Sequence, residues 1–140
     1  MQFPSEQLLV ELERCRLVWA ELEPKEHRRY IQQWIGSYGD LNVRGCRKRS
    51  GARAMAEAQK ALQGTFLLIP CRDPSFKTWN AVGSAYRCQG DTLPDLTEVS
   101  HHVDAFISPE DFNWTLFYGH EVDVFGGPDF TTAEWMSQAV

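Results

Sequence analysis

The run Thr65-Phe66-Leu67-Leu68-Ile69-Pro70 decides the fold class of this 140-residue chain. It is short, apolar and rich in residues that favour strands, and it follows Gly64. A continuous apolar run of this length between turn residues is typical of a strand in the interior of a sheet. The run therefore predicts a central β-strand.

Helices are predicted on the N-terminal side of this strand. Apolar residues recur at helical spacing at Leu8, Leu12, Cys15, Trp19 and Leu22, which predicts a helix over Ser5–Leu22. Pro24 suits the first turn of a second helix that runs to Ile35 before Gly36, so the pair predicts a helical hairpin. A third helix is predicted from Ser50 or Gly51 to Leu62.

Strands dominate the C-terminal side. We predict strands at Ala81–Cys88 and Ala105–Ile107, and the alternation of Phe112, Trp114, Leu116 and Tyr118 with other residues predicts a further one. The pattern over Asp91–Val103 is ambiguous, because its apolar spacing also fits a helix. Thr131-Thr-Ala-Glu134 has the form of a capping box that opens a short last helix.

This order of elements predicts the class α+β, with N-terminal helices packed on a largely antiparallel β-sheet and a short C-terminal helix. Strands and helices do not alternate regularly, and no glycine-rich phosphate loop follows a predicted strand. The composition, 43% hydrophobic and 24% charged, is that of an ordinary globular domain. We expect a single domain over residues 1–140, with no cofactor.

The sequence predicts a cytosolic location. No apolar run is long enough to span a bilayer, and the N-terminus lacks the pattern of a secretion signal. The four cysteines Cys15, Cys46, Cys71 and Cys88 form no C-x-x-C pair, so we expect reduced thiols, with two disulfides in an exported protein as the alternative.

Charge divides the chain into two unlike parts. Residues 1–87 carry 14 Lys and Arg against nine Asp and Glu, whereas residues 88–140 carry ten Asp and Glu and neither Lys nor Arg. Either the two parts pack together and their charges complement each other, or the acidic part presents a face to a basic partner. The binding candidates on this acidic part are Asp91, Asp95 and Asp104.

The segment after the alternating strand holds the candidates for chemistry. His120, Glu121, Asp123 and Asp129 are nitrogen and oxygen donors within ten residues, which could hold a divalent metal ion or, for His120 and Glu121, act as acid and base. The alternative is that His120 is a structural residue that caps a turn and that the three carboxylates are solvated. Glu110 and Asp111 form a possible carboxylate pair, His101 and His102 suit an element boundary, and His27 is expected on the surface. No serine or cysteine lies in a nucleophile motif.

A basic cluster is the only candidate for contact with nucleic acid. It consists of Arg44, Arg47, Lys48, Arg49 and Arg53, and its alternative is a solvated loop that docks on the acidic part. The acidic net charge of −5 argues against nucleic acid. Of the five tryptophans, Trp79 and Trp135 are expected to be the most exposed and could anchor a partner, while Trp19, Trp34 and Trp114 are expected in the core.

The C-terminal part resembles a family of small bacterial proteins known only as a domain of unknown function. The resemblance rests on Phe112, Trp114, Thr115, His120, Glu121, Gly127, Pro128 and Phe130, about one-seventh of the chain. The segment Val-Asp-Val-Phe-Gly between the His-Glu and Gly-Pro pieces is longer here than in that pattern. The resemblance implies a bacterial or phage setting.

Two functions follow as hypotheses. The first is a small cytosolic protein-interaction module, of the immunity or antitoxin kind, that uses its acidic C-terminal half and needs no enzymatic activity. The alternative is a metal-dependent hydrolase, or another small enzyme, centred on His120, Glu121, Asp123 and Asp129.

Overall fold

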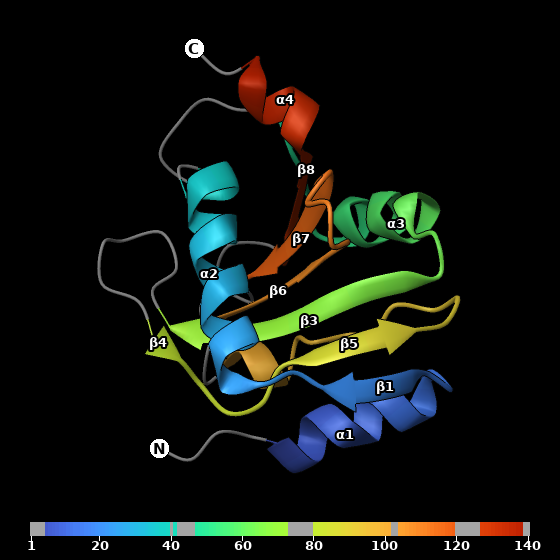
Figure 1. Ribbon diagram of the computed structural model, residues 1–140. Helices are drawn as coiled ribbons and strands as arrows, with labels where there is room; N and C mark the ends of the chain where they lie inside the picture. The colour runs from blue at the N-terminus through green and yellow to red at the C-terminus, as the bar shows by residue number, and fades with distance from the viewer. Residues whose placement is uncertain are drawn as a thin grey trace.

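The computed structural model describes residues 5–39, 41, 47–72, 80–101, 104–119 and 127–138 (Figure 1). Four α-helices, eight strands and one 3-10 helix alternate irregularly along this part of the chain. Their bounds, in order, are α1 Ser5–Arg14, β1 Val18–Glu21, α2 Pro24–Tyr38, β2 Arg49–Ser50, α3 Ala52–Ala61, β3 Thr65–Arg72, β4 Asn80–Ala81, β5 Tyr86–Gln89, η1 Val99–His101, β6 Asp104–Ser108, β7 Trp114–Tyr118, β8 Asp129–Thr132 and α4 Ala133–Ser137.

All eight strands belong to one open, antiparallel sheet. Its order is β1-β5-β3-β6-β7-β8-β2, and β4 pairs with the end of β3. The apolar run that begins at Thr65 lies in β3, between β5 and β6, so the predicted central strand is confirmed. The α+β class, the N-terminal helices, the antiparallel sheet and the short C-terminal helix are confirmed as well.

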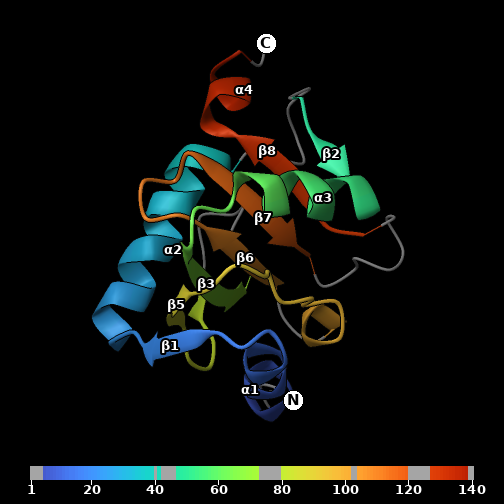
Figure 2. The same cartoon turned by 90° about the vertical axis from the view of Figure 1, so that its right-hand side faces the viewer.

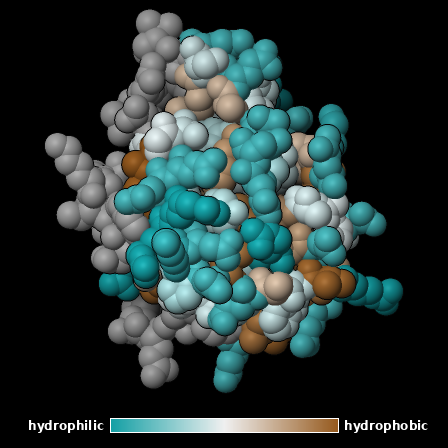
Figure 3. Space-filling model, viewed as in Figure 1, coloured by the Kyte–Doolittle hydropathy of each residue, from teal (hydrophilic) through white to brown (hydrophobic). Residues whose placement is uncertain are grey.

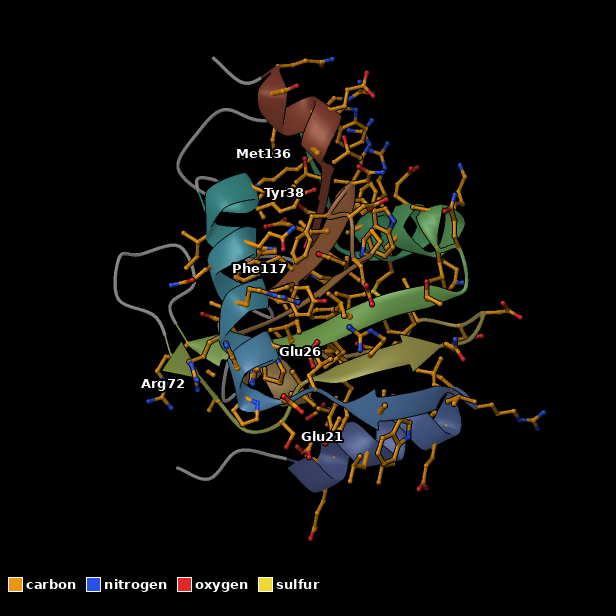
Figure 4. All side chains as sticks on the ribbon, in the orientation of Figure 1. Glu21, Glu26, Tyr38, Arg72, Phe117 and Met136 are labelled. Carbon is orange, nitrogen blue, oxygen red and sulfur yellow. The ribbon has the colours of Figure 1, made fainter. Side chains whose placement is uncertain are left out.

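Helices cover the sheet on both faces (Figures 1 and 2). Because successive side chains of a strand point to opposite faces, β3 sends Phe66 and Leu68 into a core with α1 and α3, and Leu67 and Ile69 into a core with α2 and α4. On the second face, Tyr38 from α2, Phe117 from β7 and Met136 from α4 lie together (Figure 4). The sheet is thus the middle layer of three.

The predicted helix over Ser5–Leu22 is wrong in its second half. The helix ends at Arg14, where Arg16 takes a positive φ of 55°. The amide of Arg16 donates to the carbonyl of Glu13, and that of Leu17 to the carbonyl of Leu12, which is the Schellman arrangement that closes a helix. Val18–Glu21 then forms strand β1, so the predicted helical hairpin is wrong too.

Other boundaries also differ from the sequence prediction. The second helix runs through Gly36 to Tyr38, and the predicted strand over Ala81–Cys88 is split between β4 and β5. The last helix is capped by Thr132 rather than Thr131: the Thr132 hydroxyl accepts a hydrogen bond from the amide of Trp135. Thr131 is still in β8, which displaces the cap by one residue.

The burial of two side chains differs from the prediction: His27 is buried and Trp19 is exposed. His27 is 3% exposed, because it faces β3 from α2 and its Nε2 lies 2.7 Å from the carbonyl oxygen of Pro70. Trp19 is 37% exposed, because it belongs to β1 at the edge of the sheet. Trp34 and Trp114 are buried as predicted.

A close backbone contact joins β8 to the start of α3. Gly127 has a φ of 101°, and a Cβ atom placed on it would lie 2.8 Å from the Cα of Gly51. We expect Gly127→Ala to lower the free energy of unfolding by about 1–2 kcal/mol, because both the backbone conformation and the contact disfavour a side chain. Chemical denaturation measures this difference.

Gly36 provides the matched control for Gly127→Ala. It lies within α2, and nothing lies within 4 Å of the position its Cβ would take. Gly36→Ala should therefore raise the free energy of unfolding by about 0.5–1 kcal/mol. Equal effects of the two substitutions would contradict the contact between Gly127 and Gly51.

Candidate functional site

Exposed carboxylates gather on the irregular segment between β5 and η1. Asp91, Asp95 and Glu98 are exposed, while Leu93, Leu96 and Val99 of the same segment are buried in the core with α1 and α3. We call Asp91, Asp95 and Glu98 the acidic ridge. The buried apolar residues Leu93, Leu96 and Val99 hold the backbone of this segment against the core, and the carboxylates of the acidic ridge project into solvent.

Hydrogen bonds from α3 and from the turn after α1 fix the backbone that carries the acidic ridge. From α3, the Gln59 side-chain amide donates to the carbonyl of Asp91 at 2.5 Å and accepts from the amide of Leu93 at 3.0 Å. From the turn after α1, the Cys15 thiol donates to the carbonyl of Leu93. The Asp95 carboxylate accepts from the amide and the hydroxyl of Thr97, which closes a local turn. The backbone that carries the ridge is therefore fixed by Gln59, by Cys15 and by its own turn at Asp95.

The negative charge of the ridge acts on groups inside the protein. Burial raises the pKa of the Cys15 thiol, and the nearby carboxylates Glu11 and Asp95 raise it further against the opposing effect of Arg14. Burial also raises the pKa of Tyr118, again with help from Asp95 and Glu11. Glu11 of α1 also lies near these groups, but it forms an ion pair of 3.0 Å with Arg14. No Lys or Arg in the described ranges forms an ion pair with Asp91, Asp95 or Glu98.

The three predicted binding aspartates do not form one surface. Asp91 and Asp95 lie on the ridge, but Asp104 is the first residue of β6 and is only 5% exposed. It shares the α2 face of the sheet with Phe106, so its carboxylate has almost no surface to offer a partner. Glu98 takes the place in the exposed acidic group that we expected for Asp104.

Ion pairs between residues 1–87 and residues 88–140 neutralise part of the charge asymmetry. The Arg87 Nε donates to the Glu110 carboxylate, and Lys48 Nζ lies 3.6 Å from the carboxylate of Asp129. Both contacts join a cation of residues 1–87 to a carboxylate of residues 88–140. The first alternative, in which the two parts of the chain pack with complementary charges, thus holds for Glu110 and Asp129, while the carboxylates of the acidic ridge are exposed without such a pair among the described residues.

The described part of the basic cluster lies at and near β2, the edge strand at the end of the sheet away from β1, and two of its arginines contact Trp135. The guanidinium carbons of Arg47 and Arg49 are 4.4 Å and 5.3 Å from the centroid of the half-buried Trp135 ring. Such cation–π contacts occupy the ring and restrict its use as an anchor. Lys48 pairs with Asp129, Arg53 lies in the first turn of α3, and Arg44 is outside the described residues, as is the other predicted anchor, Trp79.

The predicted metal site is described only at Asp129. Its carboxylate accepts a hydrogen bond of 2.5 Å from the Ser50 hydroxyl and pairs with Lys48, so it has structural partners across β2 and β8. His120, Glu121 and Asp123 lie outside the described residues. Within residues 5–39, 41, 47–72, 80–101, 104–119 and 127–138, no three His, Cys, Asp or Glu side chains are grouped as metal ligands. The metal site stays a prediction.

An open groove of about 920 Å³ lies over the ends of β1 and β5 and the turn after β6. The Arg87 guanidinium on its floor pairs with Glu110 and, at 3.6 Å, with Glu26, and donates to the Tyr30 hydroxyl. The Asp111 carboxylate accepts from the amide and side chain of Asn113. Glu110 and Asp111, the predicted carboxylate pair, thus hold other groups in place.

Nucleophilic chemistry is disfavoured at Cys15 and Cys88, because the pKa of each thiol is raised. Burial raises the pKa of the Cys88 thiol to about 12, and that of Cys15 is raised as described above. Since the thiolate is the nucleophile, a raised pKa lowers the reactivity of both thiols at neutral pH.

Comparisons of the chain with protein-family models, with curated proteins and with solved structures find no match. The resemblance of the C-terminal segment to a family of small bacterial proteins therefore stays a prediction. None of the described helices has the length and apolar character needed to cross a membrane.

Sequence reasoning missed the residues that shape the acidic ridge. Gln59 is 32 residues from Asp91, and its role depends on α3 lying beside the segment after β5. Only the apolar spacing of Leu93, Leu96 and Val99 could have indicated that the backbone between the acidic residues is anchored.

Proposed function

We propose that this protein is a protein-interaction module that binds a basic partner through its acidic ridge, in the manner of a small cytosolic immunity or antitoxin protein of bacterial or phage origin. The observation that carries the proposal is the exposure of Asp91, Asp95 and Glu98 on a backbone fixed by buried apolar residues. A neutralising role would require only tight binding, with no catalytic group.

Pre-organisation supports this proposal. A segment that is already fixed before binding loses little conformational entropy when it meets a partner. Leu93, Leu96 and the hydrogen bonds from Gln59 fix this segment in the unbound chain. Carboxylates on such a segment can match a set of cations in the partner without rearrangement.

Electrostatics define the chemistry of the partner. No Lys or Arg of the described part of the chain lies at ion-pair distance from a carboxylate of the ridge. A negative field of this kind accelerates association with a cationic protein surface and repels nucleic acid. The partner we propose is a protein with a Lys- or Arg-rich site. The metal-dependent hydrolase remains an alternative that the described residues do not favour.

Charge reversal tests this proposal. We expect the variant Asp91→Lys, Asp95→Lys, Glu98→Lys to lose capture of a basic protein from native lysate, because it replaces attraction by repulsion. Its melting temperature should fall by no more than a few degrees, because the substituted side chains are exposed and only Asp95 loses hydrogen bonds, those from Thr97. Quantitative mass spectrometry of proteins retained at moderate salt measures capture.

A second variant controls for total charge. Glu6→Lys, Glu13→Lys, Glu134→Lys changes the net charge by the same amount at exposed positions outside the ridge. This control should retain the basic partner. Equal loss of capture in both variants would show a general charge effect, and retention in the ridge variant would reject the proposed surface.

A further inference from the structure

Strand β1 forms one edge of the sheet, and its outer side pairs with no described strand. The amide of Leu22 donates to the carbonyl of Ala85 at 2.8 Å and continues the register that pairs Val18 with Gln89. In an antiparallel ladder the direction of the backbone groups alternates along the strand. The amides and carbonyls of Val18 and Ala20 therefore face β5, and those of Trp19 and Glu21 face outward.

The same edge exposes apolar side chains. Val10 in α1 and Val18 and Trp19 in β1 are 55%, 69% and 37% exposed, and they are the large apolar residues that the described part of the chain leaves exposed. Brown atoms stand among teal ones over α1 and β1 at the lower right of Figure 3. An edge strand with exposed apolar residues and unpaired backbone groups is suited to pairing with another strand.

Opposite charges lie at the two ends of β1. Arg16 is exposed before the strand, and Glu21 and Glu23 are exposed at and beyond its end, with Glu21 labelled in Figure 4. No ion pair joins any of these three to another described residue. A strand with a basic start and an acidic end is complementary to an antiparallel copy of itself.

We propose that a second copy of this chain binds along β1, in an antiparallel pair related by a two-fold axis at Ala20. In this register Trp19 lies opposite the partner's Glu21 and Glu21 opposite the partner's Trp19. All the outward amides and carbonyls of both strands then pair, giving four backbone hydrogen bonds. Arg16 comes beside the partner's Glu23, and a closed two-fold contact limits the assembly to a dimer.

This charge arrangement favours a second copy over a foreign strand. The two-fold operation brings each basic end to an acidic end, whereas a foreign strand would have to supply both charges in the matching order. The proposal goes beyond the acidic ridge, because the dimer needs no other partner and is measured on the purified protein. Failure of one proposal therefore leaves the other intact.

Sedimentation velocity over a range of protein concentrations tests this dimer. We expect the dimer fraction to rise with concentration and to fall with added salt. Glu21→Pro removes the outward amide of residue 21 but keeps the amide of Leu22 that binds Ala85, so the dimer Kd should rise about tenfold or more. Glu21→Thr keeps that amide and should weaken the dimer clearly less than Glu21→Pro.

A charge swap provides an independent test that does not alter the backbone. Arg16→Glu should weaken the dimer, and Arg16→Glu with Glu23→Arg should restore it, because the complementarity is restored with the signs exchanged. A chain that stays monomeric at every concentration would overturn the proposal. So would a dimer that neither Glu21→Pro nor Arg16→Glu weakens.

Discussion

Replacing Trp34 by alanine will lower the free energy of unfolding by about 3–5 kcal/mol, the range of a large aromatic truncation in a packed core. Trp34 is 1% exposed on the inner side of α2. Its ring stacks on Phe106 and Phe117, with centroids 5.2 Å and 5.0 Å away. The substitution leaves a cavity between α2 and the sheet that these rings cannot fill.

The polar atom of Trp34 adds a second loss. The indole Nε1 donates to the Thr115 hydroxyl at 2.9 Å, which also accepts from the Ser108 hydroxyl at 2.8 Å and lies 3.3 Å from the Ile107 carbonyl. Trp34→Phe keeps an aromatic ring but removes the donor, so it should lower the free energy of unfolding by only about 1–2 kcal/mol. Urea denaturation at fixed pH compares the two variants, and a Trp34→Ala effect below that of Trp34→Phe would contradict this account.

The stability of the protein will fall as the pH drops below 6.5, with a contribution from His27. Burial lowers the pKa of His27 below its usual 6.5 and Arg28 lowers it further, against the opposing effect of the hydrogen bond to Pro70. The unfolded chain therefore takes up this proton at a higher pH than the folded chain. The contribution of His27 to the free energy of unfolding is complete above pH 6.5. It decreases as the pH falls toward the pKa of His27 in the folded state, by at most about 1.4 kcal/mol per pH unit.

Comparison with His27→Gln isolates this contribution from those of other titrating groups. Glutamine retains a donor that can reach the carbonyl of Pro70 but takes up no proton. At neutral pH the variant should be less stable, by about 1–2 kcal/mol, because its shape fits the site less well. The difference should shrink between pH 6.5 and pH 5 in denaturation curves, and parallel pH profiles would contradict the assignment to His27.

The strands predicted correctly are those whose apolar residues form a pattern that is visible in the local sequence. Residues 66–70 are apolar because β3 is covered on both faces. Trp114, Leu116 and Tyr118 share the face of β7 that packs in the core with α1 and α3, and Thr115 and Phe117 are buried on the opposite face. Pro70 was no obstacle, although proline is rare in central strands. On the side of β3 that faces β5 and β4, the strand pairing ends at Leu68 and resumes at Cys71, so Pro70 lies in the gap between the two paired stretches.

The first helix was overextended because apolar spacing alone does not show where a helix ends. Leu17 and Leu22 continue the helical spacing, but both are buried after Arg16 has closed the helix. The branched side chain of Val18 and the ring of Trp19 favour a strand once β5 is available to pair with. That pairing joins residues about 70 positions apart and has no local signature.

Burial of single polar residues was harder to predict than the fold. His27 precedes Tyr30, Ile31 and Trp34 at helical spacing, so its position on the buried face of α2 was detectable, but its charge next to Arg28 favoured a surface prediction. Asp104 begins a strand whose depth in the sheet depends on neighbours on both sides. The acidic composition of residues 88–140 predicted a charged surface, but could not show which carboxylates form it.

The side-chain amide of Gln59 acts toward the ridge segment as a neighbouring peptide group would, with one donor and one acceptor. The path of the backbone there depends on Gln59, Leu93 and Leu96, whereas Asp91 and Glu98 contribute no side-chain hydrogen bond to the described fold. Under the proposed function, recognition depends on Asp91 and Glu98, whereas folding of the same segment depends on Gln59, Leu93 and Leu96. Substitutions at positions 91 and 98 could change the partner over evolutionary time while the fold stayed the same.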